Sequence, residues 1–173
     1  MSCLQTLSGI AASCDTSIGG IRIAYICNYA DVTGFTVDPD TNMVSTITMA
    51  SSAKFKEYHF RANSSSMTST LNVDPANGVN YVQSDLNLVF AKQETVKRME
   101  VARLSLGELR VIVKDANDKY WFLGAEEPVY ASAGTAETGQ NRTDGNRYSI
   151  TLTDISASYP YEIDPTIVAD LVG

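Results

Sequence analysis

Short segments in which apolar and polar residues alternate dominate this chain, and such alternation predicts β-strands. The longest covers residues 21–29, where we expect a strand with one firmly buried side formed by Ile21, Ile23, Tyr25, Cys27 and Tyr29. Further strands are predicted at residues 53–61, 109–115, 119–124 and 147–153. In the last of these we expect Tyr148, Ile150 and Leu152 to point inward.

Residues 66–90 predict a β-hairpin with one apolar and one polar face. Two alternating segments, 66–73 and 81–90, flank a turn that contains Pro75 and the pair Asn77-Gly78. The polar face consists of Thr68, Thr70, Asn72, Gln83, Asp85 and Asn87. No Lys or Arg belongs to this face, so the face is polar without being basic.

One α-helix is predicted at residues 93–106, because Val96, Met99 and Leu106 recur at helical spacing. Glu94 near its start complements the helix dipole, and Gly107 is placed to cap its end.

The basic residues of this helix, Lys97, Arg98 and Arg103, have two interpretations. They alternate with Glu94 and Glu100, which is typical of an exposed helix face held by pairs three and four residues apart. The sharper hypothesis is a contact between subunits, and the sequence leaves both open.

These elements predict a mainly β protein, an antiparallel β-sandwich or barrel with one flanking α-helix. No domain boundary is visible, so residues 1–173 are expected to form a single domain with an N-terminal arm at 1–19. Residues 132–146 are rich in Gly, Thr and Asn and lack apolar anchors, which predicts a long exposed loop.

Charge narrows the possible functions. The chain of 173 residues carries 13 Lys and Arg against 20 Asp and Glu, a net charge of −7. Such acidity argues against a dedicated nucleic-acid binder, which needs clustered basic residues to neutralise phosphates. No apolar run could span a membrane, and no basic residue precedes Arg22 as a secretory signal would require. We expect a soluble protein made in the cytoplasm.

The sequence offers little catalytic or metal-binding chemistry. His59 is the sole His and lies mid-strand, where a structural role is more typical than catalysis. Cys3, Cys14 and Cys27 lack the close pairing of zinc ligands, so inert or buried thiols are favoured, with a Cys3–Cys14 disulfide possible only after oxidation outside the cell. The run from Asp38 lacks the Gly and Glu of a calcium loop. We therefore expect no catalytic residue, cofactor or metal.

A series of short motifs runs along nearly the whole chain. In order, these are Cys3, Gly9-Ile10, Cys14, Gly19-Gly20-Ile21, Lys54-Phe55, Tyr58, Phe60-Arg61, Gly78-Val79, Tyr81-Val82, Lys97-Arg98, Val111-Ile112-Val113-Lys114-Asp115, Tyr120-Trp121, Leu123-Gly124, Gly134-Thr135, Thr138-Gly139 and Tyr161-Glu162-Ile163-Asp164. Their order resembles that of the major tail tube proteins of tailed bacteriophages. The chain departs from the pattern at Asp118, where a Gly would be expected in the turn.

The resemblance implies a structural protein rather than an enzyme. In this family, and in related tubes of contractile injection systems, six copies form a ring and stacked rings form a hollow tube that conducts the genome. Inner strands of the six copies join into one barrel, while loops and an arm lock successive rings. The implied partners are further copies, the tape measure, the tail terminator and, in a contractile tail, a sheath, with DNA only in transit. The implied location is the virion tail, assembled in the host cytoplasm.

Two expectations connect this resemblance with the residues. The polar face of the 66–90 hairpin either lines the bore or is an ordinary solvent-exposed face. Residues 1–19, 30–45 and 132–146 are expected to be partly disordered in the monomer and to become ordered between copies.

Two alternatives to a tube subunit remain. One is another virion protein, for head decoration or tail completion, and stoichiometry distinguishes the two because a tube subunit should be among the most abundant virion proteins. The other is a carbohydrate-binding β-sandwich that uses Trp121 and Tyr120 as a stacking platform, although Trp121 in an alternating strand is more typical of a core residue.

Overall fold

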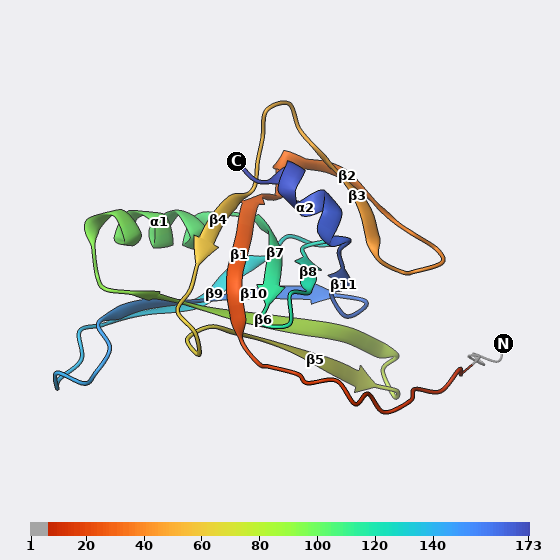
Figure 1. The fold of residues 1–173 in the computed structure, drawn as a ribbon, viewed down its shortest axis with the longest axis horizontal. Coiled ribbons are helices and arrows are strands. Elements are labelled where there is room, and N and C mark those ends of the chain that lie inside the picture. The colour runs from red at the N-terminus through yellow and green to blue at the C-terminus, as the bar shows by residue number, and fades with distance from the viewer. Residues whose placement is uncertain (1–6) are drawn as a thin grey trace.

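The computed structural model describes residues 7–173 and shows three antiparallel β-sheets with two α-helices. Figure 1 shows a long, nearly flat sheet at the base, a second sheet standing above it, and a small hairpin and a short helix above that. The predicted antiparallel β-sandwich with a flanking helix is confirmed, and a second, C-terminal helix joins it. No helix within these residues is both long and apolar enough to cross a membrane.

The middle layer is a five-stranded sheet with the order β11-β8-β7-β1-β4. Its strands are β1 (Ile21–Asn28), β4 (Lys56–His59), β7 (Leu109–Asp115), β8 (Tyr120–Leu123) and β11 (Tyr161–Glu162). The hairpin between β7 and β8 turns at Asp118, whose φ of +62° is the left-handed conformation that Gly adopts most readily. The turn thus has the backbone expected of a Gly at this position, and Asp118 occupies it.

The base layer is a four-stranded sheet with the order β5-β6-β10-β9. Its strands are β5 (Ser66–Asp74), β6 (Val79–Ala91), β9 (Tyr130–Glu137) and β10 (Arg147–Ser156). The predicted 66–90 hairpin is β5 and β6, whose register runs from Ser66 opposite Asn87 to Asp74 opposite Val79. The side of the base sheet that faces the middle layer is its sandwich side, and the opposite side is its outer face.

The third layer consists of a small hairpin and the C-terminal helix. Its elements are the one-turn 3₁₀ helix η1 (Tyr29–Asp31), β2 (Val32–Val37), β3 (Val44–Met49) and α2 (Pro165–Leu171). The Asp38 carboxylate forms the turn between β2 and β3 by accepting hydrogen bonds from the amides of Asp40 at 2.8 Å and Thr41 at 3.3 Å. β2 and this turn fall within residues 30–45, and the expected partial disorder of this segment in the monomer stays a prediction.

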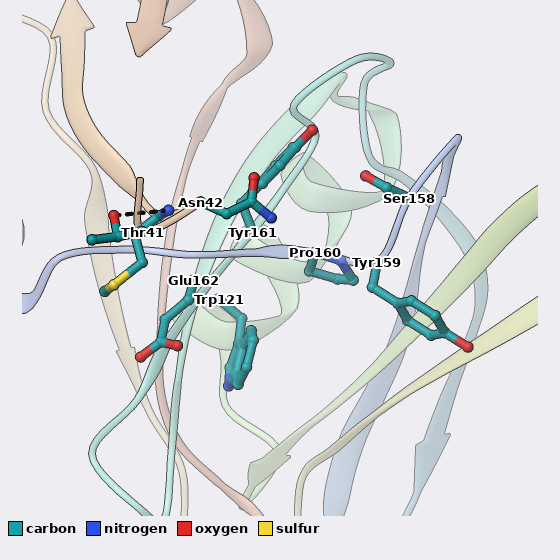
Figure 2. Close-up of a pocket in the computed structure, with 9 residues that line it drawn as sticks. Thr41, Asn42, Trp121, Ser158, Tyr159, Pro160, Tyr161 and Glu162 are labelled. Atoms are coloured by element: carbon teal, nitrogen blue, oxygen red, sulfur yellow. Dashed lines mark hydrogen bonds between the residues drawn. The ribbon is translucent and has the colours of Figure 1, made fainter. Parts of the chain in front are cut away.

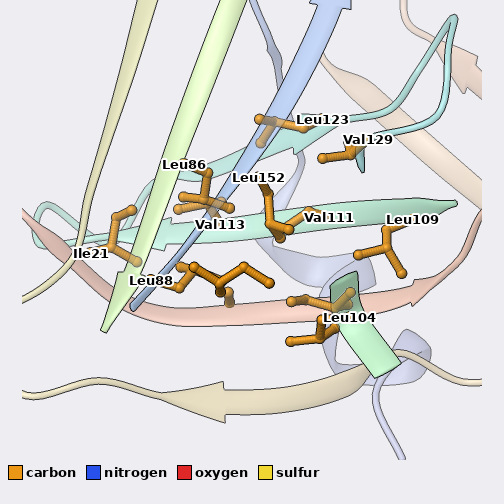
Figure 3. Packing of buried hydrophobic residues seen from close by; sticks show 13 residues of the cluster. Ile21, Leu86, Leu88, Leu104, Leu109, Val111, Val113, Leu123, Val129 and Leu152 are labelled. Atoms are coloured by element: carbon orange, nitrogen blue, oxygen red, sulfur yellow. The ribbon is translucent and has the colours of Figure 1, made fainter. Parts of the chain in front are cut away.

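The main core lies between the middle and base sheets. Leu86, Leu88 and Leu152 of the base sheet meet Val111 and Leu123 of the middle sheet, and all five are completely buried (Figure 3). Burial on this scale contributes about 1.5–3 kcal/mol for each side chain. Ile150 and Leu152 point inward as predicted, and Tyr148 is half-buried.

A second core covers the other side of the middle sheet and corrects the prediction for β1. Tyr25 and Cys27 pack against the β2–β3 hairpin and α2, while Ala24 and Ile26 on the opposite face enter the main core. Both faces of β1 are therefore buried, because it belongs to the middle of three layers. Burial raises the pKa of the Cys27 thiol to about 12, which keeps it protonated and unreactive.

The predicted helix is α1 (Thr95–Leu106), but its orientation differs from the expectation. Leu104 is its buried residue, with Val101 packed beside it. Val96 and Leu106, which suggested the helix by their spacing, are 77% and 90% exposed. A single buried row is enough here because α1 lies on the edge of the sandwich and not within it.

The segment 132–146 is exposed, as predicted, but its first six residues belong to β9. The backbone of β9 pairs with β10, from Tyr130 opposite Thr153 to Glu137 opposite Arg147. The strand was not apparent in the sequence because its side chains are small and bury little. The loop proper is 138–146, where the Asp144 carboxylate accepts hydrogen bonds from the amides of Gln140 and Asn141.

Candidate functional site

The six residues of the predicted polar face lie together on the outer face of the base sheet. Thr68 is opposite Asp85 and Thr70 is opposite Gln83 in the register of β5 and β6, while Asn72 and Asn87 continue the same face. β10 extends this face with Thr151 and Thr153, which lie opposite Asn87 and Asp85. Of the intervening residues, Met67, Leu86 and Leu88 pack in the main core, so the contrast between the two faces is a direct result of the period-two pattern.

Hydrogen bonds connect the side chains of this outer face. The Asp85 carboxylate accepts from the Thr153 hydroxyl at 2.7 Å and from the Gln83 amide at 3.0 Å. The Thr153 oxygen is also 2.8 Å from the Ser132 hydroxyl of β9. On the same face, the Ser149 hydroxyl donates to the Asn87 amide oxygen at 3.0 Å. The network crosses three strands and therefore holds these polar side chains in place on the outer face.

The outer face offers no free positive charge along its strands. Among the strand residues of the base sheet, the sole Lys or Arg is Arg147, at the end next to the 138–146 loop. Its guanidinium pairs with the Glu137 carboxylate at 3.0 Å and 3.1 Å. This surface can therefore hydrogen-bond water but has little attraction for phosphate.

Both edges of the base sheet are open. β5 and β9 are its outermost strands, and each has a paired strand on one side only within residues 7–173. Open edges expose unpaired backbone groups that can pair with another chain. The sheet is also staggered: through the intervening pairs, β9 lies level with residues 85–91 of β6, whereas β5 lies level with residues 79–87.

The basic residues predicted for subunit contacts lie along α1. Lys97 donates to the Ala91 carbonyl at 2.6 Å and pairs with Glu94, and Arg103 pairs with Glu100 at 3.1 Å. These are the pairs three residues apart that the exposed-face interpretation expects. Arg98 is exposed and its guanidinium has no carboxylate partner within the described part of the chain, so it remains available to another molecule.

A shallow cavity of about 470 Å³ lies beside Trp121, but Tyr120, its predicted partner in a sugar-stacking platform, is not among the residues that line it. Figure 2 shows the rings of Trp121, Tyr159 and Tyr161 pointing in different directions around it. Trp121 is half-buried, packs against the main core and donates its indole N–H to Asp115 at 3.1 Å.

The remaining candidates for chemistry are scattered. His59 is exposed on β4, with its Nε2 3.2 Å from the Glu57 carboxylate. Cys14 is exposed on the arm, Cys27 is buried, and Cys3 lies outside the described residues together with the start of the predicted arm. Asn117 holds the base of the arm with both amide atoms, 2.8 Å from the Ile18 N–H and 2.9 Å from its carbonyl.

Two buried polar residues were not identified from the sequence. Arg110 is 7% exposed, and its guanidinium carbon lies 4.3 Å from the centre of the Tyr29 ring. The Asp154 carboxylate accepts from the Gly124 amide, and burial raises its pKa. The available signal for Arg110 was a charge inside the apolar strand 109–113, which is where a buried guanidinium would be looked for.

Comparisons of the chain with protein-family models, with curated proteins and with solved structures find no match, so its function has to be argued from the geometry of the sheet and its edges.

Proposed function

We propose that this protein is the subunit of a phage-type tail tube, in which six copies close into a ring and rings stack into a conduit for DNA. The observation that carries the proposal is the base sheet. It combines a polar outer face without free cations and two open edges, β5 and β9. The resemblance of the sequence motifs supplies the number of copies and the tubular assembly.

The strand directions favour edge-to-edge closure. Every neighbouring pair in the base sheet is antiparallel, so β5 and β9, at opposite edges, run in opposite directions. Rotation about a ring axis keeps the direction of each strand along that axis. β9 of one copy therefore meets β5 of the next as another antiparallel pair, and the alternation continues around the ring.

The stagger of the sheet matches the tilt that a closed barrel requires. The midpoints of the ranges level with β9 and β5 are residues 88 and 83 of β6, five residues apart. At ~3.4 Å per residue this stagger is about 17 Å. Four strands spaced ~4.8 Å apart and tilted by ~40° need a stagger of about 16 Å in each copy. A sheet with level strands would not close in this way.

The resulting bore has a suitable width. Twenty-four strands at the same spacing and tilt form a barrel of about 48 Å backbone diameter. Side chains of ~5 Å on each side leave a channel of roughly 38 Å, wider than a DNA duplex of roughly 20 Å. The outer face of the base sheet, with Thr70, Gln83 and Asp85, then lines the channel and holds a layer of water between wall and DNA.

Microscopy and thiol labelling test the proposal. Concentrated protein should form rings or hollow rods in negative stain. In a background with Cys3→Ser and Cys14→Ser, a Thr70→Cys thiol inside the tube should react with a small maleimide but not with one attached to a bulky polymer. A Val96→Cys thiol on α1 serves as the exposed control and should react with both. Protein that stays monomeric, or equal reaction of the bulky reagent at both positions, would contradict the proposal.

A further inference from the structure

The helix α1 overhangs the edge of the base sheet at which β9 lies. It packs on β9 and β10, while β4 occupies the neighbouring place above β6, where the Tyr58 and Phe90 rings are 6.1 Å apart. The Tyr58 hydroxyl donates to Glu100 at 2.6 Å, which fixes the flank of α1 that faces β4. The opposite flank, about half a turn away, carries Arg98 and Ala102, both exposed. This flank faces beyond β9.

On the sandwich side of β9, the side chains beside α1 are small. Gly134 lies opposite Ile150 and Ala136 opposite Tyr148, and Ala131 continues the row past a register shift. Ile150 is buried in the main core, so this row faces the same side. Together with α1 the row forms an L-shaped shelf, with a low floor at the free edge and the helix as its wall.

The opposite edge of the same sheet carries large apolar side chains that residues 7–173 leave about half exposed. Leu71 and Val73 of β5 are 45% and 56% exposed. Leu71 lies opposite the buried Val82, so it belongs to the sandwich side. In Figure 1 the β5–β6 hairpin extends past the middle sheet, which accounts for the uncovered face of its tip.

We propose that Leu71 and Val73 of one copy seat on the shelf formed by β9 and α1 of the next copy. This inference rests on the proposed function, because it takes the pairing of β9 with β5 as its starting point. Side chains that point to one face must meet others on that face, so the stagger of about five residues becomes four or six. Either value places Leu71 opposite a small residue, Ala131 or Gly134.

Charge favours the same pairing. The hairpin at residues 66–91 carries two carboxylates, Asp74 and Asp85, and no Lys or Arg. Residues 92–106, with α1, carry four basic and two acidic residues. The hairpin at the β5 edge thus has a net negative charge and the helical segment above the β9 edge a net positive charge, which favours head-to-tail contact of the two edges and disfavours contact of like edges.

Disulfide trapping tests the contact directly. In the Cys3→Ser, Cys14→Ser background, Leu71→Cys is combined with Gly134→Cys or with Ala131→Cys, and the assembled protein is treated with oxidised glutathione. One of these pairs should yield a ladder of covalent oligomers. The control combines Leu71→Cys with Thr135→Cys, which lies next to Gly134 on the outer face and should stay monomeric on a denaturing gel.

A second readout measures the energy of the contact. Leu71→Ser should raise the protein concentration needed for assembly by about tenfold or more, as expected for loss of a leucine that assembly buries. Val79→Ser is the matched control, because Val79 is 41% exposed on the outer face of the same hairpin and should shift that concentration less than about twofold. Disulfide trapping does not use the Leu71→Ser variant, so it tests the contact even if that substitution changes the folding of the monomer.

The outcomes separate the inference from the proposed function. If the unmodified protein forms no rings, both are overturned. If rings form but neither cysteine pair is trapped and Leu71→Ser assembles like the unmodified protein, the shelf contact is wrong and the tube remains. Trapping of the Thr135→Cys control in place of the two test pairs would show that the facing sides of the strands are reversed.

Discussion

Arg110 provides a sharp test of how this fold tolerates a buried charge. Its guanidinium lies over the Tyr29 ring at 4.3 Å, with the Phe35 and Phe122 ring centres at 5.9 Å and 6.0 Å. Nε and Nη1 are buried and donate to no acceptor in the described part of the chain. The aromatic rings therefore provide the main compensation for a charge removed from water.

The balance of these effects predicts that Arg110→Met is stabilising. Each buried donor without an acceptor costs about 1–3 kcal/mol. A desolvated cation over an aromatic ring returns about 2 kcal/mol. Methionine reaches about as far as the arginine Nε, so it keeps the apolar packing of the side-chain stem and has no donor to satisfy. We expect the free energy of unfolding to rise by about 1–3 kcal/mol.

Urea unfolding followed by tryptophan fluorescence measures the change, since the chain has one Trp, Trp121. The midpoint should move to higher urea while the slope stays constant. Lys114→Met is the control on the same strand, because Lys114 keeps an ion pair with Asp118 and its replacement should change stability by less than about 0.5 kcal/mol. A loss of stability in Arg110→Met would refute the reasoning and show that the guanidinium is stabilising on balance.

Four other variants test the core, a buried acid, a glycine and the outer face. Leu152→Ala, at a side chain that is completely buried, should lower the free energy of unfolding by about 2–5 kcal/mol in thermal or urea unfolding. Burial raises the pKa of Asp154 above its ordinary 3.8, so its contribution to stability is full below pH ~4 and is lost as pH rises through the folded value. Asp154→Asn should therefore remove this fall, and its stability relative to the unmodified protein should increase from pH 3 to pH 7; a constant difference would contradict the assignment. Gly124→Ala, at a φ of +84° with Leu109 O only 3.1 Å from the added Cβ, should cost at least ~1 kcal/mol more than Gly78→Ala, where φ is +67° but the space is open. Thr70→Lys should make assembled tubes retain DNA, with the affinity falling by roughly 0.9 log units per log unit of salt for each phosphate contacted, whereas Val96→Lys on α1 should not.

The sequence predicted the parts of this fold in which side-chain burial decides the structure. The alternation in residues 66–90 located β5 and β6, and it separated Leu86 and Leu88 from Asp85 and Asn87 correctly. A strand between two cores, such as β1, was misjudged because its alternation is visible only when one face is polar. β9 was missed for the opposite reason, since a strand of Ala, Gly, Ser and Thr is held by backbone pairing and has almost no hydrophobic pattern.

The candidate site was predicted in part. Its six polar residues could be assigned to one face from their spacing alone. The open edges, the stagger and the shelf beside α1 could not, because they depend on how β5, β6, β10 and β9 are ordered, and strand order is set by contacts far apart in the chain. The burial of Arg110 and Asp154 could not be predicted from the sequence either, since it results from the layers above β7 and β10.

The edges of the base sheet support the proposed assembly. Monomeric β-proteins protect edge strands with Lys, Pro or inward-pointing charges. β5 contains none of these and carries one charge, Asp74 at its end, while β9 carries one, Glu137 at its end. Both strands are eight or more residues long, so both would invite uncontrolled pairing in a protein that remained alone. Under the proposed function, opposite strand direction and a stagger near the closure value favour pairing of β9 with β5 of the next copy, and a ring closed in this way leaves no edge exposed.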